Sequence, residues 1–187
     1  EVDIQPLTPL LKEEGFTFER KVVEAIAAMG EEVQELGSTD EGETAAWLRR
    51  AKSPVVLLQP RVIGRVGDYM VTGQADVVRL ARAASGELQI YIADVKASRQ
   101  ERMEHRLQVA TYAYLLRQMA EAAGVTLGEL KGGVLHVQED GTLPRLDVEQ
   151  GFDLDSYFTI LGHIAIDEGC VLERVSALPF EEVPYHL

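Results

Sequence analysis

At 187 residues the chain is long enough for one domain with a hydrophobic core and too short for two ordinary domains. Its content of 46% hydrophobic and 26% charged residues is typical of a globular protein and excludes fibrous and disordered classes. The net charge of −13 argues at first sight against a nucleic-acid partner, because phosphate binding depends on cationic side chains.

The sequence contains no recognisable targeting or membrane signal. No stretch approaches the roughly 18 consecutive apolar residues of a membrane span. The acidic beginning also lacks the apolar core of a secretory signal, so we expect a cytoplasmic location and no membrane partner. Because the first residue is Glu1 and not Met, we expect a processed chain or a piece of a longer protein. Cys170 is the only cysteine, so the chain supports neither an intrachain disulfide nor an iron–sulfur cluster.

The first half of the chain predicts two helices followed by strands. Apolar residues at helical spacing predict a helix within residues 15–30, with Gly30 as its stop. Asp40 is the candidate N-cap of a second helix within 38–52. Three segments rich in Val, Ile and Tyr then predict strands or bent strand pairs, at residues 54–64, 68–83 and 87–97.

The rest of the chain predicts a long helix, two strands joined by an Asp140–Gly141 turn, and a last helix that contains Cys170 and has Asp153 or Asp155 as its N-cap. These elements are residues 99–124, 132–138, 143–149 and 153–175. The order predicts an α/β or α+β fold, with a mixed central sheet flanked by helices, as a single domain over residues 1–187.

Polar side chains on two neighbouring predicted strands suggest a site. Asp94 and Lys96 share one face of a strand, because side chains two residues apart point the same way. A three-residue loop at 84–86 would place Asp76 directly opposite Asp94, with Cβ atoms about 4.5–5.5 Å apart. A shift of one residue in the register would move Asp76 to the other face.

Two carboxylates at that separation repel each other unless a cation lies between them, and Mg²⁺ or Mn²⁺ suits oxygen ligands. Such an ion polarises a phosphoryl oxygen, while a nearby ammonium group such as that of Lys96 neutralises developing charge. Phosphodiester hydrolysis would use all three groups. The alternative is an exposed Asp94–Lys96 pair and an unrelated Asp76.

The helix that follows carries Gln108 and Tyr112 on one face. The ordered blocks "GQAD" (73–76), "DVK" (94–96) and "QVATY" (108–112) resemble the G-x-x-D, D-x-K and Q-x-x-x-Y motifs of RecB-type nucleases of the PD-(D/E)XK superfamily, a group that includes CRISPR-adaptation nucleases and recombination exonucleases. The resemblance implies a restriction-endonuclease-like fold and a metal-dependent deoxyribonuclease.

The resemblance also implies roles for individual residues. Asp76, Asp94 and the Val95 carbonyl would hold the ion, Lys96 would be the catalytic amine, and Gln108 and Tyr112 would support the site or contact the DNA strand. Relatives bring a further ligand from an early helix, and Glu19 stands at the matching place; a solvated Glu19 beside Arg20 is the alternative. Many relatives carry a four-cysteine iron–sulfur cluster, which this chain does not support.

Positive charge is concentrated in the segment that carries these motifs. Residues 48–117 contain 12 basic and 6 acidic side chains, a net charge of +6. Arg99, Arg102 and Arg106 follow the D-x-K motif and are candidates for positioning a nucleic-acid strand; a solvated helix face is the alternative. The four histidines show no metal-ligand spacing, so we expect them to be structural or exposed.

We therefore expect a Mg²⁺- or Mn²⁺-dependent DNA nuclease, an exonuclease acting on single strands or duplex ends in repair, recombination or CRISPR adaptation. One alternative is a non-catalytic DNA-binding or scaffold module that retains the nuclease fold and binds partner proteins in a larger machine. Another is a nuclease for RNA or for branched structures, since the motifs do not separate the sugar types.

Overall fold

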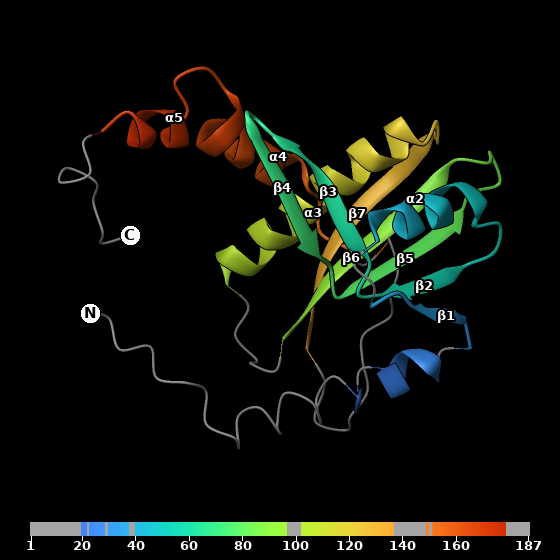
Figure 1. Ribbon diagram of the computed structural model, residues 1–187. Helices are drawn as coiled ribbons and strands as arrows, with labels where there is room; N and C mark the ends of the chain where they lie inside the picture. Colours follow the sequence, from blue (N-terminus) through green and yellow to red (C-terminus); the bar gives the residue numbers. More distant parts are fainter. Residues whose placement is uncertain are drawn as a thin grey trace.

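The computed structural model describes residues 20–21, 23–28, 30–37, 40–96, 102–136, 149 and 151–178 (Figure 1). Residues 20–21 and 23–27 are helical. The labelled elements are β1 (Glu32–Glu35), α2 (Glu41–Arg50), β2 (Val55–Leu58), β3 (Arg61–Val66), β4 (Tyr69–Gln74), β5 (Val77–Arg82), β6 (Leu88–Lys96), α3 (Met103–Ala122), β7 (Leu127–His136), α4 (Asp155–Leu161), the π-helix η2 (Gly162–Ile166) and α5 (Val171–Ser176).

The central sheet is mixed, as the sequence predicts. Its strand order is β1-β2-β5-β6-β7, with parallel pairs at both edges and antiparallel pairs in between. The short edge strand β1 was not predicted. The expected strand at 143–149, apart from Glu149, and the Asp140–Gly141 turn lie outside the described residues. None of the helices in the described ranges has the length and apolar composition that a bilayer crossing requires.

One long hairpin bends out of this sheet. Leu58 pairs with Val77 in the sheet and Arg61 pairs with Gln74 in the hairpin β3–β4, so the register continues unchanged through the bend. At the bend, the Gln59 N–H donates to the Asp76 carbonyl (3.0 Å), and Pro60 has no N–H to donate. Asp76 therefore lies where the hairpin separates from the sheet.

The β3–β4 hairpin packs on α3, which it crosses in Figure 1. Gln118 of α3 hydrogen-bonds the backbone of Arg65, accepting from its N–H (3.0 Å) and donating to its carbonyl (2.7 Å). Gly64 permits this approach, since a Cβ there would lie 2.8 Å from the Gln118 Oε1. The side-chain amide thus satisfies the backbone N–H and carbonyl of Arg65 at the edge of the hairpin.

The second hairpin sets the predicted register. The Ala83 N–H donates to the Glu87 carbonyl (3.0 Å) and the Gly86 N–H to the Ala83 carbonyl (2.9 Å), which closes a loop over residues 84–86. Gly86 has a φ of +90°, a conformation that suits glycine. With Val77 opposite Ala93, the next residues along, Asp76 and Asp94, stand opposite each other.

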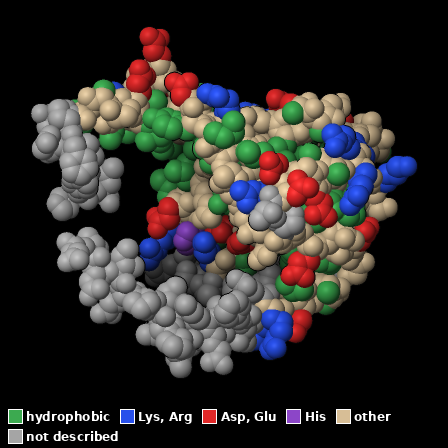
Figure 2. All heavy atoms as spheres, viewed as in Figure 1, with side chains coloured by type: hydrophobic (Ala, Val, Ile, Leu, Met, Phe, Trp, Pro, Cys, Tyr) green, Lys and Arg blue, Asp and Glu red, His purple; other side chains and the backbone are tan. Residues whose placement is uncertain are grey.

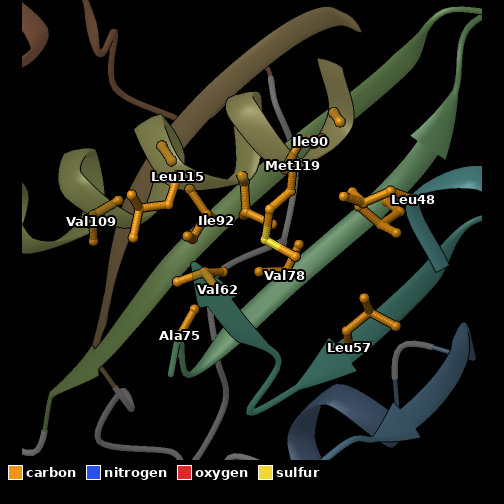
Figure 3. Close-up of a cluster of buried hydrophobic side chains, with 14 of the residues drawn as sticks. Leu48, Leu57, Val62, Ala75, Val78, Ile90, Ile92, Val109, Leu115 and Met119 are labelled. Atoms are coloured by element: carbon orange, nitrogen blue, oxygen red, sulfur yellow. The ribbon is translucent and has the colours of Figure 1, made fainter. Parts of the chain in front are cut away.

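The core lies between the sheet, α3 and the hairpin (Figure 3). Val78, Ile90 and Ile92 of the sheet meet Leu115 and Met119 of α3, each at most 8% exposed. Burial of such a side chain stabilises the fold by about 1.5–3 kcal/mol. The opposite face of the sheet has a smaller core, which contains Ile26, Val56, Tyr91 and Leu135. Both faces of the sheet are thus occupied by apolar cores, so we expect a functional site at the ends of the strands.

The predicted last helix is interrupted. It consists of α4, the π-helix and α5, with a break at 167–170 that includes Gly169 at φ +69°. The N-cap of α4 is Leu154, so the prediction of Asp153 or Asp155 was wrong, although Oδ1 of Asp153 accepts from the Asp155 N–H (2.9 Å). Cys170 is buried, as expected, yet it lies before α5 as its N-cap, where Sγ accepts from the Glu173 N–H (3.4 Å). Placing Cys170 inside a helix was therefore wrong.

Candidate functional site

The two predicted carboxylates meet at the end of the β5–β6 hairpin. Asp94 is 5% exposed, on the same face of β6 as the core residue Ile92. Oδ2 of Asp76 accepts a hydrogen bond from the Val95 N–H (2.7 Å). This bond gives the Val95 N–H an acceptor beyond the end of the β5–β6 ladder, and it fixes the Asp76 carboxyl group beside Asp94.

Lys96 lies against this pair. Its Nζ is 3.0 Å from Oδ2 of Asp94, and its side chain remains 29% exposed. The contact is a close ion pair, and no described residue donates a hydrogen bond to the buried Oδ2 of Asp94. The site therefore keeps a buried acceptor oxygen for a further ligand.

The environment changes the acidity of the pair. The pKa of Asp76 is raised to about 6, mainly by burial and also by the neighbouring Asp94, although the Val95 N–H and Lys96 act in the opposite direction. A cation placed between the carboxylates would stabilise both in their charged form.

These groups fit a hard divalent ion. Mg²⁺ is commonly held by one or two carboxylates, with water and substrate phosphate as the other ligands. Asp76 and Asp94 supply that number. Within the described ranges, no three His, Cys, Asp or Glu side chains gather as a metal-binding group. Glu19 lies outside the described residues, and its part and that of the Val95 carbonyl stay predictions.

Gln108 and Tyr112, which the sequence predicts on one face of the helix, differ in their exposure and contacts. Gln108 is exposed, whereas Tyr112 is half-buried against the backbone of β4. A Cβ at Gly73 would lie 2.5 Å from Tyr112 Cε1 and 3.0 Å from its hydroxyl oxygen. The glycine of "GQAD" and the tyrosine of "QVATY" are therefore packing partners, and this contact holds α3 against the hairpin that ends at Asp76.

Of the three arginines that the sequence predicts to contact DNA, the two that the structure describes lie in different environments. Arg99 lies outside the described residues. Arg102 is exposed and lies 3.4 Å from a carboxylate oxygen of Glu104. Arg106 faces the C-terminal part of the fold, where it donates to the Tyr157 hydroxyl (3.3 Å) and lies 5.0 Å above the Phe152 ring. A contact of Arg102 or Arg106 with nucleic acid stays a prediction.

The structure brings one histidine to the site that the sequence did not. His136 is the register partner of Lys96 on the adjacent parallel strand β7, and within the part of the chain that the structure describes its two buried ring nitrogens have no hydrogen-bond partner. The parallel register depends on the long crossover through α3, so no local signal could reveal it. His105 has a buried, unpartnered Nδ1, His163 is exposed with Nδ1 3.2 Å from Asp167, and His186 lies outside the described residues.

Charged side chains of both signs gather on the molecule's surface near one histidine. On the face that Figure 2 shows, a histidine side chain lies beside Lys or Arg and Asp or Glu side chains. A mixed surface of this kind suits phosphate contact only where the basic groups are not already paired.

A family model described as the PD-(D/E)XK nuclease superfamily matches residues 12–175. The chain belongs to this superfamily. Its members are generally hydrolytic nucleases that use divalent metal ions, which agrees with the carboxylate pair and Lys96.

No curated protein matches the chain. Two crystal structures of the Legionella pneumophila effector RavZ show partial similarity. One has 15% identity over 54% of this chain, with a TM-score of 0.29. The other, RavZ in complex with human LC3B, has 13% identity over 65% of this chain, with a TM-score of 0.27. The match covers 31% of either RavZ chain.

Proposed function

We propose that this chain is a Mg²⁺- or Mn²⁺-dependent DNA nuclease of RecB type that hydrolyses phosphodiester bonds. The main supporting observation is the convergence of Asp76, Asp94 and Lys96 at one end of the sheet, with a 2.7 Å bond from the Val95 N–H and a 3.0 Å ion pair that position them. The order of the three motifs supports the RecB type.

Each residue has a role in this proposal. Asp76 and Asp94 would hold the ion, and the Val95 N–H orients the Asp76 carboxyl group. Lys96 places a positive charge next to the position where the phosphate gains negative charge, a form of stabilisation that is strong in a partly buried site. The ion, when bound, supplies Lewis acidity and lowers the pKa of a bound water.

We propose exonuclease action on single strands or duplex ends, in repair, recombination or CRISPR adaptation. The test is to incubate end-labelled linear DNA, circular DNA and RNA of matching sequence with the protein in Mn²⁺, with EDTA as the metal-free control. An exonuclease degrades the linear DNA and leaves the circle intact. Cleavage of the circle would indicate endonuclease action, and preferential cleavage of RNA would identify the protein as a ribonuclease.

The variant Lys96→Ala tests the chemistry. We expect cleavage to fall by at least about a hundredfold, since a fixed charge at the reacting phosphate contributes that much in comparable sites. Lys131→Ala is the matched control, because Lys131 also pairs with an aspartate, at 3.4 Å from Asp153, on a part of the fold that the proposed site does not use. Full activity of Lys96→Ala would contradict the proposal.

A second candidate is a non-catalytic DNA-binding or scaffold module with partner proteins. It is favoured by the direct Lys96–Asp94 contact, which could replace a metal ion in neutralising the carboxylates. Calorimetric titration with Mn²⁺ separates the two. A nuclease binds Mn²⁺ and loses that binding in Asp94→Asn, whereas a scaffold of this kind binds none.

A further inference from the structure

His136 is a polar side chain at this end of the sheet to which the proposed mechanism gives no role. It is the last residue of β7, opposite Lys96 in the register. Register partners carry their side chains on the same face, and adjacent strands lie about 4.8 Å apart. The imidazole therefore lies on the face that carries Asp94 and Lys96, one strand farther from Asp76.

His136 is half-buried, and within the described ranges its ring nitrogens lack the hydrogen bonds that a structural histidine usually makes. Both its ring nitrogens are buried, and neither has a hydrogen-bond partner among the described residues. In every protonation state an imidazole has at least one N–H donor, so at least one buried donor is unsatisfied. An apolar side chain at the same position would avoid the free energy that this costs. The geometry therefore suits a partner from outside the chain.

A phosphate oxygen is the partner that fits best. A nucleic-acid strand bound at Lys96 brings a row of phosphate oxygens, all of them acceptors, along the face that His136 shares. A metal ion fits less well, since within the described residues His136 forms no group of three metal-binding side chains with Asp76 and Asp94.

We infer that His136 contacts the substrate of the proposed nuclease site, where its ring N–H donates to a phosphate oxygen next to the one that Lys96 faces. This inference rests on the proposed function and assigns to it a second phosphate subsite, on β7. The contact positions the strand, so its loss weakens binding more than it slows the chemical step.

The test compares His136→Leu with His136→Gln, which retains an N–H donor. His163→Leu is the matched control, because His163 is exposed in the C-terminal region, beside Asp167. Three quantities are measured: the Kd for a fluorescent single-stranded oligonucleotide in EDTA, kcat and KM in Mn²⁺, and Tm without nucleic acid.

We expect His136→Leu to raise Kd and KM about tenfold, to change kcat by less than about threefold, and to leave Tm equal or higher, because two unpartnered buried nitrogens are removed. His136→Gln should regain part of the binding, and His163→Leu should match the wild type.

Unchanged Kd and KM in His136→Leu would overturn the inference, and so would a fall in Tm that accompanies the weaker binding, since that result indicates packing. The proposed function fails separately, if the wild type cleaves no nucleic acid in Mn²⁺. Weaker oligonucleotide binding by His136→Leu in that case would still support the phosphate contact.

Discussion

Asp76 and Asp94 show how single residues at this site oppose folding stability. Two carboxyl groups are held together at a bend of the hairpin, and one of them has its pKa raised to about 6 by burial and by its neighbour. Lys96 compensates in part. A protein selected only for stability would carry an apolar pair here, so the arrangement indicates a function that needs both carboxylates.

The pKa of Asp76 leads to a prediction about pH. A pKa of about 6 in the folded state lies above the ordinary value of 3.8, so the protonated form of Asp76 favours folding. That contribution is complete below about pH 4 and is lost as the pH rises through 6. In EDTA, Asp76→Asn should resemble the wild type at pH 4 and be more stable by about 2–3 kcal/mol at pH 7.5. Denaturant unfolding at both pH values measures this.

Asp153→Asn is the control, because the pKa of Asp153 is shifted in the opposite direction to that of Asp76. The Asp155 N–H and, to a smaller extent, Lys131 lower the pKa of Asp153, so its charged form favours folding above the ordinary pKa. Its substitution should therefore decrease stability at pH 7.5 and have little effect at acid pH. A loss of stability in Asp76→Asn at pH 7.5 would contradict the repulsion that we infer.

At the scale of elements, two specific contacts link α3 to the β3–β4 hairpin in addition to their shared core. Gln118 hydrogen-bonds Arg65 near the far end of the hairpin, and Tyr112 packs on Gly73 near Asp76. The second contact links two sequence motifs that are more than thirty residues apart. The contact explains the glycine of "GQAD", because the Tyr112 ring lies so close to the backbone that it leaves no room for a side chain at Gly73.

Gly73→Ala tests this contact. The added Cβ would lie 2.5 Å from Tyr112 Cε1, so the ring or the strand must move. We expect a loss of about 1–3 kcal/mol in stability, as for other overpacked sites, together with lower cleavage activity. Combined with Tyr112→Ala, the change should cost less than the sum of the two single variants, by about 1 kcal/mol or more.

Gly37→Ala is the matched control for that cycle, since its added Cβ would meet only Gln59 Oε1, at 3.8 Å. Its effect on unfolding should be within about 0.5 kcal/mol. Strict additivity of Gly73→Ala and Tyr112→Ala would show that the two residues do not interact.

At the scale of the whole molecule, the basic segment contributes more to the fold than its charge suggests. Arg79 pairs with Glu31 at 2.7 Å, and Arg82 donates to the carbonyls of Ala51 and Gly86. Further side chains of residues 48–117 contact carboxylates or aromatic rings; these are Arg50, Arg61, Arg65, Lys96, Arg102, Arg106 and Arg117. A net charge of +6 in sequence therefore does not produce an equally basic surface.

Metal binding should stabilise the entire domain, because the two carboxylates belong to the central sheet. At a Mn²⁺ concentration of a hundred times Kd, the free energy of unfolding should rise by about 2.7 kcal/mol. The gain should increase with pH through about 6, since the ion competes with the proton on Asp76. Thermal unfolding with Mn²⁺ and with EDTA measures it. An equal gain in Asp94→Asn would place the ion elsewhere.

The sequence by itself determined the fold class, the Asp40 N-cap and the pairing of Asp76 with Asp94. These depend on short-range chemistry, since a loop over residues 84–86 with Gly86 at positive φ sets the hairpin register. Only the tertiary structure decided the bend at Gln59–Pro60, the contact between Tyr112 and Gly73, and the place of His136 beside Lys96. Those depend on how α3 packs between a hairpin and a parallel strand, and the packing of distant segments leaves no local pattern in the sequence.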